Sequence, residues 1–222
     1  MLGLIYDLHG NLPALEALVA EADALGVDSW LLGGDYGIPS PWPLETLERL
    51  ETLPNATWIR GNTERWAREF PDLPELREAY EQHVIGVVPD VVIDRLYRLP
   101  AQVELDGVLY VHGSPLSDVE SFAPEPQADD ERLLAGVRGR TVVFGHSHLQ
   151  FRRPGPNDTQ LLNPGSAGMP LDGDRRPGWA TRDGDFTFHR TEYDVERAVA
   201  GFLGLRSKFG ERVARRLERG SD

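Results

Sequence analysis

The chain has 222 residues, a net charge of −13 and no cysteine. Disulfides and thiolate metal sites are therefore excluded, and the acidic balance argues against general binding to a nucleic-acid polymer. Hydrophobic residues make up 40% of the chain, enough to bury the core of one large domain over residues 1–222. No segment approaches the ~20 apolar residues of a membrane span, and the N-terminus lacks the basic start of a signal peptide. We expect a cytoplasmic protein without a membrane partner.

The first predicted strand and helix enclose two polar residues. Residues 2–6 are apolar and predict a buried strand, and residues 12–25 carry apolar side chains at the helical period. Asp7 and His9 lie between them, at the kind of strand-to-helix crossing where open α/β sheets place ligands. Asn11 stands where it can cap the helix.

The next two predicted strands end in a similar way. Residues 28–32 are followed by Gly33-Gly34-Asp35, and residues 57–60 by Gly61-Asn62, with a helix expected at about 44–52. Three successive strands are thus followed closely by carboxylate, imidazole or amide side chains, which can bind metal ions.

Residues 65–98 are polar and helical in pattern, with breaks at Pro71, Pro74 and Pro89. We interpret this stretch as a helical insertion over the edge of the sheet. It is either a lid or oligomer contact, or a simple connecting pair of helices.

The pattern becomes β from residue 101. Residues 101–105 and 108–111 flank Asp106-Gly107, which is the strongest short signal for a hairpin. His112 follows the second of these strands, and a helix is expected near residues 129–137.

A short apolar strand at 141–144 leads into Gly145-His146-Ser147-His148. In an extended chain the spacing of His146 and His148 places both imidazoles on the same side. Two neutral imidazoles at the end of a buried strand suit transition-metal binding. The alternative is an exposed loop that contains two histidines.

The rest of the chain is expected to form antiparallel strands and then helices. The expected strands span residues 149–153, 160–162, 178–182 and 186–190, the last two joined by a turn at Asp183-Gly184. A C-terminal helical segment at about 195–219 should break at Gly204 or Gly210. Its arginines can attract anions or form a solvated helix face. They are Arg212, Arg215, Arg216 and Arg219.

Seven polar residues share a position just after a predicted strand. They are Asp7, His9, Asp35, Asn62, His112, His146 and His148. A set of Asp, Asn and His without cysteine suits Mn²⁺, Fe or Zn²⁺ more than Ca²⁺. Seven ligands are too many for one tetrahedral site and fit two metal ions that share a carboxylate.

The series Asp-x-His, Gly-Asp, Gly-Asn, a single His and Gly-His-x-His resembles the calcineurin-like metallophosphoesterase superfamily. The resemblance extends from about Leu2 to His189. Two stretches resemble its small prokaryotic phosphodiesterase branch, namely Asp7-Leu8-His9-Gly10-Asn11-Leu12 and Leu162-Asn163-Pro164-Gly165-Ser166 with a following Asp172-Gly173-Asp174. The family implies an α/β fold, an αββα four-layer sandwich of two mixed β-sheets flanked by helices, with the site at the strand ends.

The resemblance also implies a role for each residue of the set. One divalent metal ion would be held by Asp7, His9 and His148. The other would be held by Asn62, His112 and His146. Asp35 would bridge the two ions together with a hydroxide that attacks phosphorus in line. Mn²⁺ is the first expectation, with Fe, Zn, Ni or Mg as alternatives. The residues predicted to act in catalysis are Asp35, Asn62 and His112.

Thr63 departs from the pattern, because many members of the superfamily have histidine after Gly-Asn. Threonine cannot act as a general acid near pH 7, since its hydroxyl pKa is far too high. Cleavage of poor leaving groups would then need a water molecule or another residue.

Five nearby residues each have two interpretations. We predict that Asn11, Arg60 and Asn62 contact substrate, but Asn11 can instead cap a helix and Arg60 can be an exposed arginine. Glu64 can hydrogen-bond a metal-binding histidine, or it can be an acid at a helix N-terminus. Asn163 and Ser166 can line the site, or they can be present because their residue types favour a turn.

These features predict a metal-dependent phosphoric ester hydrolase. Its substrate would be a small phosphodiester or phosphomonoester, with nucleotides among the candidates. The alternatives are a protein serine/threonine phosphatase and a non-catalytic metal-binding interaction scaffold. The presence of all seven ligand types argues against the scaffold. The sequence leaves open whether the chain forms a homo-oligomer.

Overall fold

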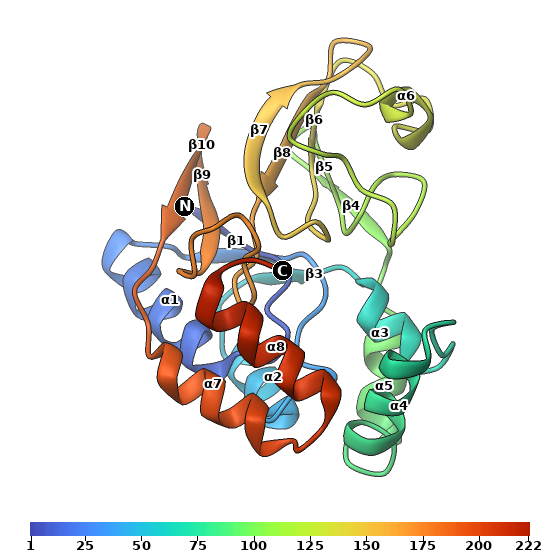
Figure 1. Cartoon of the computed structure of the whole chain (residues 1–222). Coiled ribbons are helices and arrows are strands. Elements are labelled where there is room, and N and C mark those ends of the chain that lie inside the picture. Colours follow the sequence, from blue (N-terminus) through green and yellow to red (C-terminus); the bar gives the residue numbers. More distant parts are fainter.

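Two five-stranded β-sheets form the centre of the molecule in a computed structural model that describes all residues from 1 to 222 (Figure 1). The first sheet has the order β10 (Asp185–Arg190), β9 (Gly178–Asp183), β1 (Leu2–Ile5), β2 (Ser29–Leu32) and β3 (Ala56–Trp58). The second has the order β4 (Gln102–Leu105), β5 (Val108–Val111), β6 (Thr141–Val143), β8 (Gln160–Pro164) and β7 (Gln150–Pro154). Both sheets contain parallel and antiparallel pairs, so the predicted class of two mixed sheets is confirmed.

Each sheet has a parallel centre. In the first sheet β1 pairs with β2 and β2 with β3, all parallel. In the second sheet β5 pairs with β6 and β6 with β8, also parallel. Because the carboxyl ends of parallel strands lie at the same edge, the loops that follow them are gathered in one place. The predicted hairpin at Asp106-Gly107 is confirmed, with both turn residues at positive φ, as a two-residue turn of this kind requires.

The strands after residue 149 differ from the prediction of one antiparallel run. β7 and β8 are antiparallel partners in the second sheet, but β8 is also parallel to β6. β9 and β10 pair in the first sheet, where β9 lies antiparallel to β1. Periodicity identifies the strands but carries no information on which sheet each one joins, so the crossing between sheets after Pro164 was not predicted.

The inner faces of the two sheets pack against each other. Leu4 and Leu31 from the first sheet, with Tyr6 just after β1, share one buried cluster with Tyr110 and Val143 from the second sheet. This contact makes two layers of the sandwich and fixes the two sets of strand ends beside each other.

Two helices, α1 (Leu12–Leu25) and α2 (Pro43–Glu51), pack on the outer face of the first sheet (Figure 1). Two further helices, α7 (Val195–Gly204) and α8 (Lys208–Arg219), lie outside this layer, where α7 contacts α1 and α8 contacts α7. The bounds of α1 match the prediction, and the Asn11 side chain accepts a hydrogen bond from the Ala14 N–H at its start, at 3.2 Å. The C-terminal segment breaks after Gly204, one of the two glycines expected to break it. The outer layer over the second sheet is thinner, a single short helix, α6 (Asp130–Leu133), with the loops beside it.

The stretch expected as a helical insertion contains three helices. They are α3 (Asn62–Trp66), α4 (Pro74–His83) and α5 (Asp90–Tyr97). They lie together at the β3 side of the molecule, and α4 also contacts α8 (Figure 1). None of the helices has both the length and the apolar character needed to cross a bilayer.

Candidate metal centre

All seven residues predicted as metal ligands lie just after parallel strands, six in loops and one at the start of a helix. Asp7 and His9 follow β1, Asp35 follows β2, and Asn62 opens α3 after β3. His112 follows β5, and His146 and His148 follow β6. The structure brings these seven residues from both sheets into one cluster.

One group of ligand atoms contains Asp7, His9 and His148. The Nε2 atoms of His9 and His148 are 3.0 Å apart, and the Asp7 Oδ1 atom lies 3.5 Å from His148 Nε2 and 4.0 Å from His9 Nε2. These three atoms lie within 4.8 Å of one another, which is the spacing expected of atoms around one metal ion.

A second group contains Asn62, His112 and His146. Asn62 Oδ1 lies 2.9 Å from His112 Nε2 and 2.9 Å from His146 Nδ1. The opposite amide orientation would turn the Asn62 NH₂ group toward both ring nitrogens. The amide can therefore offer its oxygen to a metal beside two histidines, or hydrogen-bond both histidines without one.

Asp35 lies between the two groups. Its Oδ2 atom is 3.7 Å from His9 Nε2, and its Oδ1 atom is 3.4 Å from His112 Nε2. His146 and His148 belong to different groups, although their spacing predicted imidazoles on the same side. Both have a left-handed backbone, at φ 64° and 59°, so the rule for an extended chain does not apply to them.

Backbone carbonyls fix the histidine rings. His112 Nδ1 lies 2.9 Å from the Gly33 carbonyl, and His148 Nδ1 lies 2.7 Å from the Met169 carbonyl. A carbonyl only accepts, so each Nδ1 must carry the proton and donate it. In the neutral rings each Nε2 atom then carries a lone pair, and it faces the other ligand atoms of the site, which is the arrangement of metal-binding histidines.

Five of the seven residues have positive φ angles between 49° and 64°, and they are Asp7, His9, Asp35, His146 and His148. This conformation is uncommon outside glycine and costs on the order of 1–3 kcal/mol per residue. Surrounding hydrogen bonds hold it in place. The Ser166 hydroxyl donates to the Asp7 carbonyl at 2.6 Å, and the Asn163 amide donates to the Gly145 carbonyl at 2.9 Å. Asn163 and Ser166 therefore position ligand loops through their side chains.

Glu64 holds the Asp35 loop. Its buried carboxylate accepts hydrogen bonds from the backbone N–H groups of Asp35, Tyr36 and Gly61, each at 2.9 Å. It makes no hydrogen bond to a histidine, so the expectation that it orients a metal-binding histidine is wrong, while its place in the first turn of α3 is as predicted. Gly34, at φ 94°, leaves space for this crossing, because a Cβ there would lie 2.5 Å from the Gly61 nitrogen.

Two buried carboxylates lie in this cluster without a lysine or arginine partner. The Asp7 and Asp35 residues are 0% and 2% exposed, and the charged partners within 4.0 Å are histidines alone. Asp7 Oδ1 is buried without any hydrogen bond. Buried charges need compensation, and an unpartnered carboxylate oxygen among imidazole nitrogens fits a divalent cation. The residues present therefore fit metal ions.

Titration in this cluster follows from burial and close charges. Burial and the neighbouring Glu64 and Asp7 raise the pKa of Asp35 to about 7, although His112 opposes the change. Burial disfavours the charged form of His112, but Asp35 and Asp7 outweigh it and raise its pKa to about 9. Burial and the neighbouring His112 lower the pKa of His146 to about 4.

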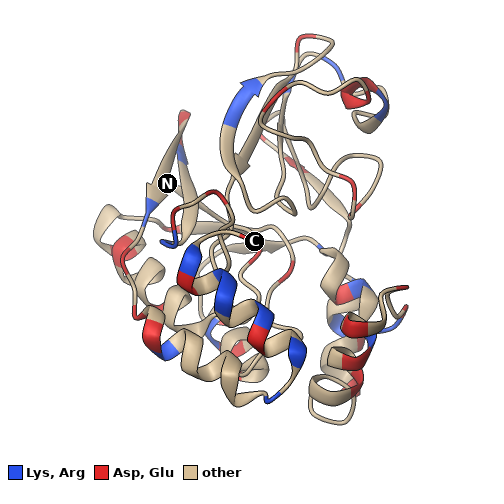
Figure 2. Ribbon diagram, in the orientation of Figure 1, with Lys and Arg blue, Asp and Glu red and all other residues tan.

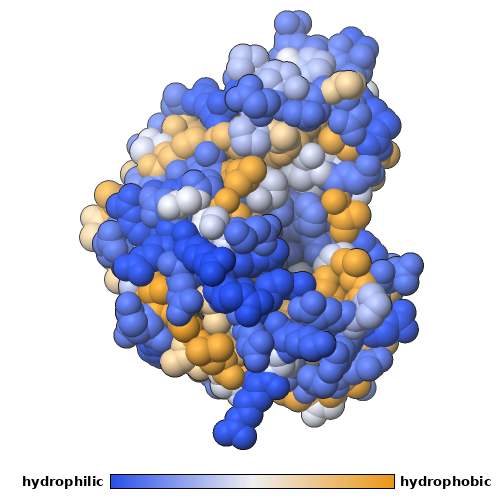
Figure 3. All heavy atoms as spheres, viewed as in Figure 1, coloured by the Kyte–Doolittle hydropathy of each residue, from blue (hydrophilic) through white to orange (hydrophobic).

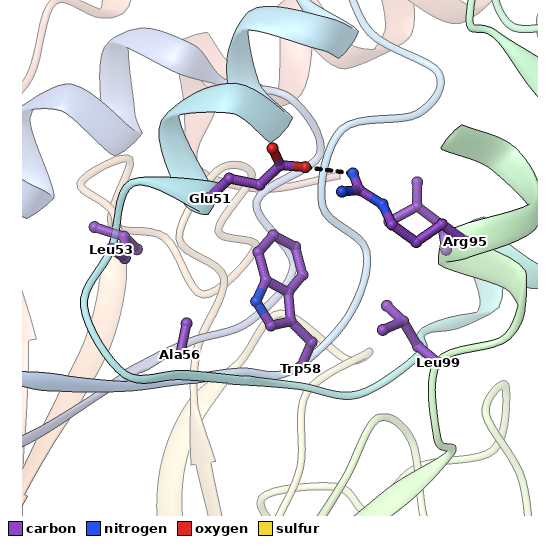
Figure 4. A pocket seen from close by; sticks show the side chains of 7 residues that line it. Glu51, Leu53, Ala56, Trp58, Arg95 and Leu99 are labelled. Atoms are coloured by element: carbon purple, nitrogen blue, oxygen red, sulfur yellow. Dashed lines mark ion pairs between the residues drawn. The ribbon is translucent and has the colours of Figure 1, made fainter. Parts of the chain in front are cut away.

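A cavity of about 290 Å³ opens over the cluster. His9, Asp35, Asn62, His146 and His148 line it on the side of the strand ends. The opposite side comes from α3, α4, α7 and α8. A second cavity of about 280 Å³ lies at the β3 edge, beside Trp58 and an ion pair between Glu51 and Arg95 (Figure 4). That cavity has no histidine and no cluster of ligand atoms, so the chemistry belongs to the first.

The predicted substrate residues differ in their placement. Asn62 lines the cavity, whereas Asn11 is fully buried outside it. The Asn11 side chain caps α1 and donates to the Gly168 carbonyl at 2.7 Å, so it serves the fold. Arg60 donates to the Tyr97 carbonyl at 2.8 Å and lies over the Tyr97 ring, and it does not line the metal cavity.

Most of the cavity wall was not identified from the sequence, including three residues with polar side chains. Tyr80 of α4 lies in the wall and donates to the Thr63 carbonyl at 2.8 Å. Arg212 and Arg216 of α8 also line the cavity. The sequence signal for the arginines was their i, i+4 spacing beside Phe209 and Val213, which marks one helix face, but nothing in the sequence indicated which part of the molecule that face meets.

An αββα sandwich with carboxylate, amide and imidazole ligands at its strand ends defines the class of metal-dependent phosphoesterases. The sequence profile of the calcineurin-like phosphoesterase superfamily domain matches residues 1–183. The chain therefore belongs to the calcineurin-like phosphoesterase superfamily, whose members are divalent-metal-dependent hydrolases of phosphoesters.

The individual proteins that resemble this chain share 22–26% sequence identity with it. An uncharacterized protein of Methanocaldococcus jannaschii is 24% identical over 223 residues, which cover 89% of this chain and 90% of the relative. A metallophosphoesterase from Sphaerobacter thermophilus has a similar structure, with a TM-score of 0.82, 26% identity and 99% of each chain covered. A phosphoesterase from E. coli shares the fold at a TM-score of 0.51 and 22% identity, over 83% of this chain and 88% of its own.

Proposed function

We propose that this protein is a dinuclear metal-dependent phosphoesterase that hydrolyses small phosphodiesters or phosphomonoesters, with nucleotides among the candidates. The observation that carries the proposal is the position of Asp35. Its two carboxylate oxygens face different ligand groups, Oδ2 toward His9 and Oδ1 toward His112. A carboxylate in that position can serve two ions at once, which suits a pair of divalent cations about 3.5–4 Å apart.

Each ligand group would hold one ion. The first would be bound by Asp7, His9 and His148. The second would be bound by Asn62, His112 and His146. Asp35 would be shared. Mn²⁺ is our first expectation for this mixture of oxygen and nitrogen ligands, with Fe, Zn, Ni or Mg as alternatives. When bound, such ions lower the pKa of water from 15.7 toward ~7 and polarise the phosphoryl oxygens, so that hydroxide is available near neutral pH.

The charge of the site supports a phosphate ester. Two dications against the carboxylates of Asp7 and Asp35 leave about two positive charges by simple counting of ligand charges. The protein as a whole carries −13. A phosphate is therefore attracted to this cavity and repelled by the rest of the molecule.

No side chain in the cavity wall is placed to protonate the leaving group, so the residues of the chain mainly position the substrate. Thr63 lines the cavity, but its hydroxyl donates to Glu64 at 3.2 Å and is too weak an acid to protonate a leaving group. Tyr80 is buried and donates to a backbone carbonyl. Esters with good leaving groups should therefore be cleaved best.

The size of the cavity favours a small ester over a phosphoprotein. Its volume is about 290 Å³, and helices bound it on the side opposite the ligands. A protein serine/threonine phosphatase would need an open surface where α4 and α8 stand.

The test is hydrolysis of bis-p-nitrophenyl phosphate and p-nitrophenyl phosphate by metal-stripped protein titrated with Mn²⁺, Ni²⁺, Zn²⁺ and Mg²⁺. Activity should saturate near two ions per chain. It should be lost in His146→Ala and retained in His83→Ala, because His83 lies outside the cavity. The preferred ester separates a diesterase from a monoesterase.

The binding of two ions without hydrolysis of either ester, whichever metal is used, would contradict the proposal. That result would favour the interaction scaffold. Activity that saturates at one ion per chain would contradict the dinuclear assignment alone.

A further inference from the structure

The helix α8 presents two guanidinium groups to the cavity that holds the metal ligands. Arg212 and Arg216 are one helical turn apart and both line this cavity, together with Phe209 and Val213 of the same helix. They are the only arginine or lysine residues that line it. Figure 2 shows the positive residues gathered along α8, and Figure 3 shows a hollow between α8 and the α3–α4 side.

The present partners of these arginines are exposed carboxylates. Arg212 Nη1 lies 3.1 Å from Glu75 of α4, and its Nε atom is buried without a hydrogen bond. Arg216 pairs with Asp222, whose side chain is 70% exposed. Exposed ion pairs are worth about 0–1 kcal/mol. A phosphate group can therefore displace these carboxylates at small cost.

The proposed metal ions can neutralise the scissile phosphate without these arginines. The proposed pair of metal ions already supplies about two positive charges on the strand-end side of the cavity, by the count of ligand charges. Two further guanidinium groups on the opposite side offer planar forks of N–H donors, which match a second phosphate. A cavity with positive groups on two sides is complementary in charge to a ligand that carries negative groups at both ends.

The wall beside the arginines is apolar. Leu73 and Leu76 from the α4 side and Trp66 of α3 face the same cavity. Apolar and aromatic side chains of this kind can contact the organic part of an ester. The cavity thus combines a place for a reacting phosphate, a place for a second anion and an apolar surface.

We propose that Arg212 and Arg216 bind a second phosphate of the substrate, so that the preferred substrates are organic phosphoesters with a further phosphate group, such as nucleoside bisphosphate esters. This inference rests on the proposed phosphoesterase function. The arginines are specificity-determining residues, and removing them should act on substrate selection more than on the reacting phosphate.

A matched pair of esters tests the proposal. Thymidine 5′-(p-nitrophenyl phosphate) and its 3′-phosphorylated analogue share one leaving group and one nucleoside and differ in one phosphate. The wild-type protein with Mn²⁺ should favour the 3′-phosphorylated ester in kcat/KM. Arg212→Ala and Arg216→Ala should each lower this preference by about tenfold or more, the effect of losing charge-assisted hydrogen bonds, and leave kcat/KM for the other ester within about twofold.

Three controls separate recognition from other effects. Arg215→Ala and Arg219→Ala change the net charge equally, but both residues are exposed and outside the cavity, so the preference should remain. Glu75→Gln removes the partner of Arg212 and should not lower the preference. Asp222→Asn frees Arg216 and should raise it.

The outcomes are distinguishable. No preference in the wild type, an equal loss for both esters in the arginine variants, or a loss in Glu75→Gln that matches Arg212→Ala would each overturn the proposal. Calorimetry of thymidine 3′,5′-bisphosphate against thymidine 5′-monophosphate measures the same preference without catalysis. If the wild type cleaves neither ester, the phosphoesterase proposal fails, and the ratio of the two dissociation constants still decides the role of the arginines.

Discussion

The two sides of the cavity are built in different ways. On the strand-end side, Asp7 and Asp35 are almost fully buried, and the side chains of Ser166 and Glu64 hold their backbone by hydrogen bonds. On the helical side, the side chains of Arg212 and Arg216 are 33% and 24% exposed, and their ion pairs reach the surface. The ligand residues of the first side are fixed by buried hydrogen bonds, whereas the two arginines of the second side are held by ion pairs near the surface.

The difference separates two tasks. Chemistry with metal ions needs ligand atoms in fixed positions, and the first side pins five residues in an uncommon backbone conformation to provide them. Substrate selection can come from a wall whose residues change without disturbing the ligands. Substitutions on the strand-end side should therefore remove activity, and those on the helical side should change its preference.

Asp35→Asn should have the largest effect. One residue faces both ligand groups, so the loss of its charge should weaken both ions together and lower kcat by about 10³-fold or more, the scale expected when a central electrostatic group is removed. Metal binding is measured by calorimetry and activity with bis-p-nitrophenyl phosphate. Loss of one ion with the other unchanged would contradict the shared role.

A change of pH should have the second-largest effect, on the affinity for metal ions. With pKa values raised to about 7 and about 9, Asp35 and His112 hold protons that metal ions must displace. Affinity should therefore rise by up to about tenfold per pH unit per proton between pH 6 and 9. His146, with its pKa lowered to about 4, is already deprotonated in this pH range and adds no dependence there. Calorimetry in buffers of different ionisation enthalpy counts the released protons, and a flat profile would contradict these shifts.

The same shifts predict how the metal-free protein responds to pH. The folded pKa of His112 is above its ordinary value of 6.5, so its contribution to stability is full below pH 6.5 and is lost as the pH rises through about 9. The metal-free protein should unfold more easily at pH 9 than at pH 7, and bound ions should reduce the difference. Denaturant titrations at both pH values measure it.

Glu64→Gln should have an intermediate effect on the strand-end side. The NH₂ group of the new glutamine would face backbone N–H donors that hydrogen-bond to the Glu64 carboxylate in the wild type. The free energy of unfolding should therefore fall by about 1.5–3 kcal/mol. For a chain of this size the melting temperature should fall by roughly 3–12 °C. Glu69→Gln is the matched control, because Glu69 is exposed and pairs only at the surface. An equal fall in both variants would show that the buried hydrogen bonds of Glu64 do not matter.

Thr63→His should have the smallest effect. An imidazole at this cavity position can protonate a leaving group, so esters with poor leaving groups should gain several-fold in kcat while p-nitrophenyl esters change little. The measurement compares a methyl ester with a p-nitrophenyl ester of the same phosphate. Equal changes for both would show that leaving-group protonation does not limit the reaction.

The same two sides differ in how well the sequence predicts them. The strand-end residues follow apolar runs, and the helix over residues 12–25 shows a clear period, so both were predicted. The sequence left open whether Arg212 and Arg216 attract anions or form a solvated helix face, because arginines on an amphipathic helix look the same whether they face solvent or a cavity. Asn11 shows a second limit of sequence-based prediction. The same residue type can cap a helix or contact substrate, and only the burial of the Asn11 side chain distinguishes the two roles.

Anomalous X-ray scattering from crystals of the protein loaded with Mn²⁺ would locate the metal ions directly. We expect two peaks about 3.5–4 Å apart, as in other two-metal sites. One should lie among Asp7, His9 and His148. The other should lie among Asn62, His112 and His146. Asp35 should reach both. A single peak, or two peaks that do not share Asp35, would contradict the dinuclear centre.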